Sequence, residues 1–199
     1  MEIIKVVAAD ALQQITYLVL TPSCNILIDC GCSYDEIKAR YKKKTGTKAD
    51  VKIDVILLTH VHFDHIIGLK DVCEHCNCPV YVAKGTERQI NNPICQCANI
   101  FGKIIDFVPP TLKTAKNGEI LALGENKVKC YNTKGHAPSC MCYDFGDVLF
   151  TGDTLFLGSC GRTDLWGGNA EEMEKSLAFL ETLPQKMCYP GHGINFWLK

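Results

Sequence analysis

The stretch LLTHVHFDHIIG, at residues 57–68, constrains this 199-residue chain more than any other. It places three imidazoles and one carboxylate within six positions: His60, His62, Asp64 and His65. The preceding run, VKIDVILLTH, is typical of a buried strand. Because alternate strand residues share a side, His60 and His62 can lie on one face where the strand ends. Asp64 and His65 then follow in a turn, so all four side chains are expected at the end of this strand.

These side chains are typical metal ligands. Histidine nitrogen and carboxylate oxygen bind zinc, manganese or iron. A single ion cannot easily take four ligands from so short a loop, whereas two neighbouring ions can. The alternative is a hydrogen-bonded histidine cluster without a metal, and the density of histidine and aspartate argues against it.

Three further segments supply ligands of the same kinds. TKGHAPS contains His136, LFTGDTLF contains Asp153, and CYPGHG contains His192. Each follows a strand-like run and has glycine beside the ligand, where the backbone can bend sharply and approach closely. One such segment alone is weak evidence, but together with residues 60–65 they predict one metal centre.

The remaining pattern predicts two groups of strands, each followed by helices. Strand-like runs include residues 3–7, 15–20 and 25–31, and later 103–108, 118–124 and 126–134. Residues 34–46 predict a helix or a charged loop, and residues 169–185 predict a helix that Asn169 caps. This arrangement favours packed sheets with helices outside them.

The order of the motifs resembles the metallo-β-lactamase fold superfamily, over nearly the whole chain. The resemblance rests on His-x-His-x-Asp-His at 60–65, Gly-His at 135–136, Gly-Asp-Thr at 152–154 and Pro-Gly-His at 190–192. It implies an α/β (α+β) fold, a four-layer αββα sandwich with a dinuclear metal site at one edge of the sheets.

Carried over by motif, the resemblance implies a ligand set for each metal. One metal would be held by His60, His62 and His136, the other by Asp64, His65 and His192, with Asp153 between them. Asp29 matches the family's strand-end aspartate and would orient a ligand. Two divalent ions, with zinc expected first and iron or manganese as alternatives, would share a hydroxide for hydrolysis. Asp64 would also be catalytic, by orienting that hydroxide or moving its proton.

The segment TGDTLFLGSCGRTDLWGG, at residues 151–168, is similar to one branch of the family. Gly-Asp-Thr-Leu-Phe followed by Cys-Gly-Arg resembles the glyoxalase II subgroup, which hydrolyses glutathione thioesters such as S-lactoylglutathione. The resemblance implies that Arg162 binds substrate, because its planar guanidinium suits a carboxylate. The alternative is an exposed arginine paired with Asp164.

Other functions remain open. CGRTD is also similar to persulfide dioxygenases, which bind one iron and oxidise glutathione persulfide. Full glyoxalase II enzymes continue past the last histidine into a helical glutathione-binding domain, whereas seven residues follow His192 here. A hydrolase of another small ester or lactone, or a non-enzymatic metal-binding protein, is therefore an alternative. We expect one hydrolase domain over residues 1–199, without that helical domain, acting on a small thioester.

Charge and hydropathy bear on partners. The net charge is −1 and gives no reason to expect nucleic acid or anionic membrane. No apolar run reaches the ~18 residues of a membrane-spanning helix, and MEIIKVVAAD lacks the features of a signal peptide. We therefore expect a cytoplasmic protein that binds neither nucleic acid nor membrane, and the oligomeric state stays open.

The chain contains thirteen cysteines, and because this number is odd they cannot all pair with one another. In a reducing compartment they are expected as free thiols, many of them packed as small apolar groups. The alternative is a structural zinc site within the spacing of Cys73, Cys76, Cys78, Cys95 and Cys97. We favour free thiols, because nothing pairs the two segments at a zinc-finger spacing.

Overall fold

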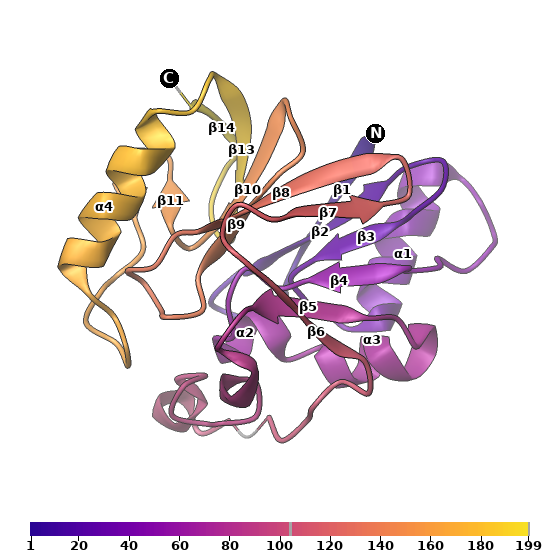
Figure 1. The fold of residues 1–199 in the computed structure, drawn as a ribbon. Helices are drawn as coiled ribbons and strands as arrows, with labels where there is room; N and C mark the ends of the chain where they lie inside the picture. Colours follow the sequence, from indigo (N-terminus) through magenta and orange to yellow (C-terminus); the bar gives the residue numbers. More distant parts are fainter. Residues whose placement is uncertain (104, 199) are drawn as a thin grey trace.

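Two six-stranded sheets lie at the centre of the molecule, a computed structural model that describes residues 1–103 and 105–198 (Figure 1). In the first sheet β1 to β3 are antiparallel, and β3 to β6 are parallel. Its strands, in spatial order from β1 to β6, are Glu2–Val7, Ile15–Leu20, Ile26–Ile28, Val55–Leu57, Val80–Ala83 and Leu112–Ala115.

The second sheet has the order β14-β13-β10-β9-β8-β7. Its pairs are antiparallel except for β10 with β13, which is parallel. From β7 to β10 the strands are Ile120–Leu123, Asn126–Asn132, Met141–Asp144 and Val148–Gly152, and β13 and β14 are Lys186–Pro190 and Phe196–Leu198. Between β10 and β13 the chain also forms a short hairpin of β11, Leu155–Phe156, and β12, Ser159–Cys160.

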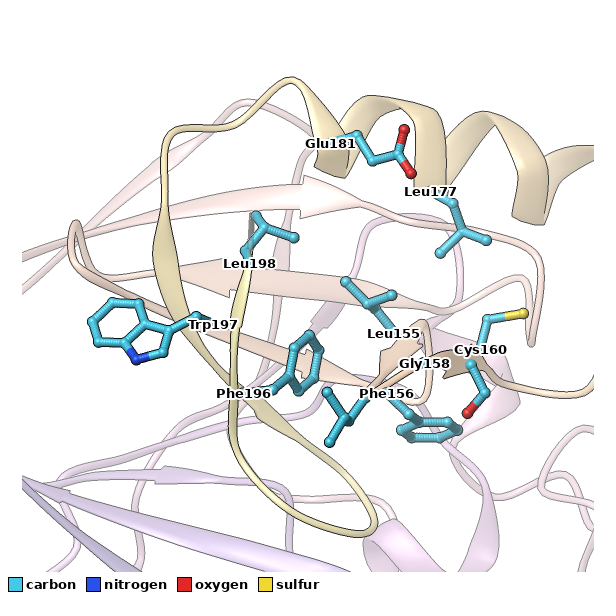
Figure 2. A pocket seen from close by; sticks show the side chains of 11 residues that line it. Leu155, Phe156, Gly158, Cys160, Leu177, Glu181, Phe196, Trp197 and Leu198 are labelled. Carbon is cyan, nitrogen blue, oxygen red and sulfur yellow. The ribbon is translucent and has the colours of Figure 1, made fainter.

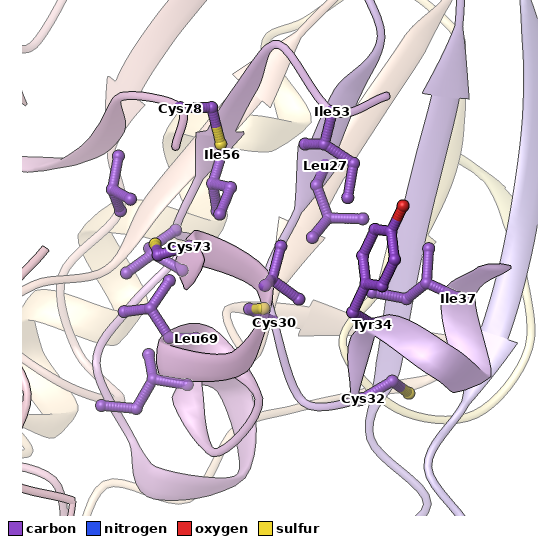
Figure 3. Close-up of a cluster of buried hydrophobic side chains, with 14 of the residues drawn as sticks. Leu27, Cys30, Cys32, Tyr34, Ile37, Ile53, Ile56, Leu69, Cys73 and Cys78 are labelled. Carbon is purple, nitrogen blue, oxygen red and sulfur yellow. The ribbon is translucent and has the colours of Figure 1, made fainter. Parts of the chain in front are cut away.

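Three apolar clusters separate the layers and confirm the predicted αββα sandwich. One joins the outer face of the first sheet to α1 (Tyr34–Thr45) and α3 (Leu69–Cys76), as Figure 3 shows in part. A second fills the space between the sheets, where Tyr17 meets Phe150. A third packs α4 (Ala170–Glu181) on the second sheet through Leu180. Successive side chains of a strand thus pack on opposite faces of the sheet, into different apolar clusters.

The helix ends follow from local sequence. Ser33 caps α1 in a reciprocal capping box with Glu36, and Gly46 ends the helix with a left-handed φ of 72°. Asn169 caps α4, as predicted, by accepting a hydrogen bond from the backbone N–H of Glu172. No described helix is both long and apolar enough to cross a membrane.

The strand predicted at residues 103–108 is wrong where the structure describes it, and Ile104 lies outside the described residues. Residues 105–109 form no regular element, although the side chains of Ile105 and Phe107 pack on the first apolar cluster. The carbonyl of Ile105 instead accepts a hydrogen bond from Gln96 Nε2. The strand that pairs with β5 is β6, after two prolines.

Candidate metal centre

All seven predicted ligands lie together at one edge of the two sheets. His60 and His62 follow β4, and Asp64 and His65 lie in α2, a single turn at Phe63–Ile66. His136, Asp153 and His192 follow β8, β10 and β13 of the second sheet, each at a strand's carboxyl end. Six of these side chains are buried, while that of His192 is 26% exposed.

The ligand atoms form three groups, within each of which all atoms lie within 4.8 Å of one another. The groups are His60, His62 and His136; Asp64, His65 and His192; and His60, His65 and Asp153. Asp153 Oδ1 lies 3.3 Å from Nε2 of His65, and its Oδ2 lies 3.5 Å from Nε2 of both His136 and His192. Asp153 therefore stands between the first two groups, as expected for a bridging ligand.

The inward-facing nitrogens lack partners. Among the described residues, Nε2 of His60, His62, His65 and His136 is buried without a hydrogen-bond partner, as is Oδ1 of Asp153. Buried polar atoms are rarely left unpaired, and this set of donors is the one that a divalent ion takes. The residues present therefore fit a metal.

Outer contacts fix which nitrogen faces inward. His136 donates from Nδ1 to the carbonyl of Arg162 at 2.8 Å, and His192 donates from Nδ1 to the carbonyl of Leu12 at 2.9 Å. His65 Nδ1 lies 2.8 Å from a carboxylate oxygen of Asp29. Each contact places the proton on Nδ1 and leaves the Nε2 lone pair free to bind a metal.

Asp29 is held in place by an unusual backbone conformation. Its φ of 58° is left-handed, which is uncommon for a residue other than glycine. The carboxylate accepts hydrogen bonds from the Thr59 backbone N–H at 2.7 Å and from the Thr59 hydroxyl at 2.8 Å. The expected orienting contact is thus present, on His65.

Burial and neighbouring charges set the protonation states. Burial, together with the nearby His136, lowers the pKa of His62 to about 3. Burial and the surrounding imidazoles also lower the pKa of His60 well below its usual value. Burial alone would raise the pKa of Asp153, but His65 and the other imidazoles hold it below its usual value. At His65 and His192 the opposite holds, because Asp29 and Asp64 respectively outweigh burial and raise the pKa of these two imidazoles. A bound cation would displace those protons, since neutral imidazoles and ionised carboxylates are the forms that bind metal.

Glycine is required where the backbone touches the ligands. A Cβ on Gly191 would lie 2.3 Å from Asp153 Oδ1 and 2.6 Å from His65 Cε1. A Cβ on Gly161 would lie 2.0 Å from the Asp153 carbonyl oxygen. These approaches explain the glycine beside the ligand in Pro-Gly-His and the glycine of Cys-Gly-Arg.

Arg162 forms the exposed pair with Asp164 that was the alternative to substrate binding, and it also lies beside the ligands. It lines the small pocket beside the ligands, which has a volume of about 160 Å³. Its side chain is also 61% exposed and makes two hydrogen bonds, of 2.6 and 2.7 Å, to the carboxylate of Asp164. The residue thus lies beside the ligands, and its guanidinium is held by the carboxylate of Asp164.

The cysteines form no comparable site. No cysteine joins a ligand group within residues 1–103 and 105–198, which include all thirteen. Eleven of the thirteen are buried free thiols, Cys76 is partly buried, and Cys160 is exposed. Cys160, two residues before Arg162, lines a different groove on the outer side of the second sheet.

Sequence reasoning missed the residues that support the ligands from a distance. Gln14 is buried and places Nε2 3.4 Å from His65 Nδ1. Thr59, which holds Asp29, was read only as part of a strand. Leu12, Phe63 and Cys97 line the pocket without any sequence signal of that role.

Comparison with known proteins places this site in a family. The sequence model of the Metallo-beta-lactamase superfamily matches residues 9–192 of this chain. The chain belongs to that superfamily. It is 30% identical over 186 residues to the "Probable metallo-hydrolase YqgX" of Bacillus subtilis (strain 168), covering 92% of this chain and 86% of that protein.

A second relative is longer than the aligned region. The chain is 29% identical over 153 residues to the "Probable polyketide biosynthesis zinc-dependent hydrolase PksB" of the same organism. That alignment covers 76% of this chain but only 61% of PksB. Both relatives are named as hydrolases.

Solved structures share the fold nearly end to end. The BLEG-1 B3 metallo-beta-lactamase superposes with a TM-score of 0.86 at 26% identity, covering 99% of this chain and 94% of that one. TTHA1623, in a di-iron-bound form, has a TM-score of 0.81 at 30% identity, with 98% and 94% covered.

Proposed function

We propose that the protein is a dinuclear metallohydrolase of small thioesters, glutathione thioesters among them. The observation that carries the proposal is the cluster of four buried, unpartnered histidine Nε2 atoms, of which those of His65 and His136 lie within 3.5 Å of Asp153. The hydrolase names of YqgX and PksB support the reaction class, and the Cys-Gly-Arg motif supports the thioester.

Two ions would be held by this chain's own residues. His60, His62 and His136 would hold one, and Asp64, His65 and His192 the other, with Asp153 between them. When bound, such a pair lowers the pKa of a shared water toward neutrality and polarises a carbonyl oxygen. Zinc is the metal we propose first, in line with the name of PksB, and the di-iron form of TTHA1623 supports iron as the alternative.

Asp64 and Arg162 would act on the substrate. Asp64 Oδ2 lies 3.2 Å from His192 Nε2 and lines the pocket, so it can orient a water or accept its proton. Arg162 lines the same pocket and would bind a carboxylate of the thiol portion, sharing its donors with Asp164. The backbone at Gly161 and Gly191 leaves no space for a side chain beside Asp153.

One observation favours a second candidate. His60, His65 and Asp153 form a set of two histidines and one carboxylate within 4.8 Å. Such a set also suits a single non-haem iron that activates oxygen. A mononuclear persulfide dioxygenase is therefore the alternative, and it differs in metal count and in oxygen consumption.

The deciding experiment is hydrolysis of S-lactoylglutathione, followed by the loss of thioester absorbance. Zinc-loaded protein should turn over and metal-stripped protein should not, and metal analysis should give two ions per chain. A β-lactam serves as a comparison substrate, because BLEG-1 is named a lactamase. Oxygen uptake with glutathione persulfide on iron-loaded protein, without hydrolysis of any thioester, would replace the proposal by the alternative.

Asp153→Ala tests the site within the same assay. Loss of the ligand between the two groups should lower hydrolysis by about two orders of magnitude or more. Asp147→Ala is the matched control, because Asp147 is exposed at the other end of β10, before Val148. Near-normal turnover by Asp153→Ala would refute the ligand assignment.

A further inference from the structure

A groove on the outer side of the second sheet has no role in the site described so far (Figure 2). Its volume is about 650 Å³, and the β11–β12 hairpin, α4 and β14 form its walls. Most of its lining is apolar, and Glu181 is the only charged residue among the described residues that line it. The principal apolar side chains are Leu155, Phe156, Leu157, Leu177, Phe196 and Trp197.

The groove adjoins the candidate metal centre. The ring of Phe156, in its lining, lies edge-on to that of His192, with centroids 6.3 Å apart. The same chain segment serves both spaces, because Asp153 precedes the hairpin and Arg162 follows it. Phe156 therefore belongs to the groove and lies close to a proposed ligand of the metal centre.

The pocket at the ligands and the groove differ in volume. The pocket at the ligands, at about 160 Å³, is smaller than the ~300–1,000 Å³ typical of small-molecule sites. It can hold the reacting group but little more. The groove lies within that range and keeps two large apolar side chains exposed, Leu157 at 57% and Trp197 at 59%.

We propose that this groove binds an apolar acyl chain of the substrate, with the thioester carbonyl at the metal centre. The inference rests on the proposed thioesterase function. Apolar walls favour a hydrocarbon chain, because burying it removes apolar surface from water. The carboxylate of Glu181 disfavours a chain that ends in a second carboxylate.

Chain-length preference tests the groove with metal-loaded protein. The ratio of kcat/KM for decanoyl over acetyl thioesters of one thiol should fall about tenfold in Leu157→Asn, which removes apolar contact. Ile120→Asn is the matched control, since Ile120 is also 57% exposed but lies on β7, at the opposite edge of the sheet from β14. Its ratio should equal that of the unmodified protein, and an equal fall in both variants would overturn the proposal.

Binding without turnover separates this inference from the proposed function. A decyl thioether of the same thiol cannot be hydrolysed, and in Trp166→Phe protein the fluorescence of Trp197 should report it. We expect tighter binding of the decyl than of the ethyl thioether, and about tenfold weaker decyl binding in Leu157→Asn. Such binding without hydrolysis of any thioester would refute the proposed function and support the groove.

Two results would overturn the groove as an acyl site. Equal affinity for the decyl and ethyl thioethers would show that the groove holds no chain. A dimer in sedimentation velocity that Leu157→Asn dissociates would show that a second copy of the protein covers it instead.

Discussion

A methyl group at position 191 would collide with the candidate metal centre. In Gly191→Ala the new Cβ would lie 2.3 Å from Asp153 Oδ1. Because the backbone here follows β13 directly, the collision must displace Asp153 or the strand end. We expect fewer than two metal ions per chain, measured by elemental analysis after dialysis against zinc.

Gly193→Ala is the control for that experiment. Gly193 has a left-handed φ of 84°, but nothing lies within 4 Å of its Cβ position. This variant should lose only about 1 kcal/mol of folding free energy to backbone strain. An equal loss of metal in both variants would show that crowding at Asp153 is not the cause.

Removing the charge of Asp29 should weaken metal binding. Asp29→Asn keeps the shape of the side chain but no longer places a carboxylate on His65 Nδ1. Loss of such a contact lowers metal affinity about 10- to 100-fold. A competition titration with a zinc-binding dye measures it, with Asp54→Asn as control because Asp54 pairs with Lys52 instead. Unchanged affinity in Asp29→Asn would contradict the orienting role.

At the residue scale the sequence predicted a cluster of side chains that the structure brings together, but it missed Gln14 and Thr59 beside them. His60, His62, Asp64 and His65 are dense enough to be read directly, and Asp29 was inferred only through resemblance. Gln14 contacts His65 across 51 positions, and Thr59 contacts Asp29 across 30. Such contacts depend on which strands become neighbours, and single residues of these types carry no signal of it.

At the scale of one element, the N-terminus of α4 offers a clean test. Asn169 accepts the Glu172 N–H at 3.0 Å and donates its own backbone N–H to the Gly135 carbonyl. Asn169→Ala should lower the free energy of unfolding by about 1 kcal/mol, because the cap is lost. Urea denaturation measures it, and Asn169→Asp should be near-neutral because aspartate also caps. Equal destabilisation by both changes would mean that the cap is not the cause.

Elements were predictable where propensity and pairing agreed. The helix predicted at 169–185 carries a strong local signal and is present as Ala170–Glu181, after the cap at Asn169. Residues 103–108 are rich in strand-forming residues, but Ile105 and Phe107 pack on the first apolar cluster from residues that form no strand. The short strand β6 has weak alternation and forms because β5 offers a parallel edge. At residues 103–108 and at β6, the availability of a neighbouring strand therefore mattered more than the local sequence pattern.

The thiols of the whole molecule should react in a fixed order. Burial raises the pKa of Cys73 to about 11 and that of Cys78 to about 12, so thiolate is scarce there at pH 8. Labelling native protein at pH 8 should give one fast thiol, Cys160, then Cys76, with all thirteen reacting in denaturant. The reactivity of Cys73 and Cys78 should rise as the pH approaches the pKa values of these two thiols.

Mass spectrometry of the labelled peptides identifies the order. Cys160→Ser should remove the fast phase and leave the slow one unchanged. More than two rapidly labelled thiols in native protein would contradict the buried positions seen in Figure 3.

The ligands of the metal centre are divided between the two sheets. Residues 60–65 follow the first sheet, whereas His136, Asp153 and His192 follow strands of the second. A nascent chain on the ribosome therefore exposes the first histidines long before the last ligand is synthesised. Since domains fold as units during synthesis, and each of the first two ligand groups draws on both sheets, any metal held there would be acquired only after the two halves have docked. Metal loading would then report completed folding, and a chain terminated before His192 would lack one of the ligands.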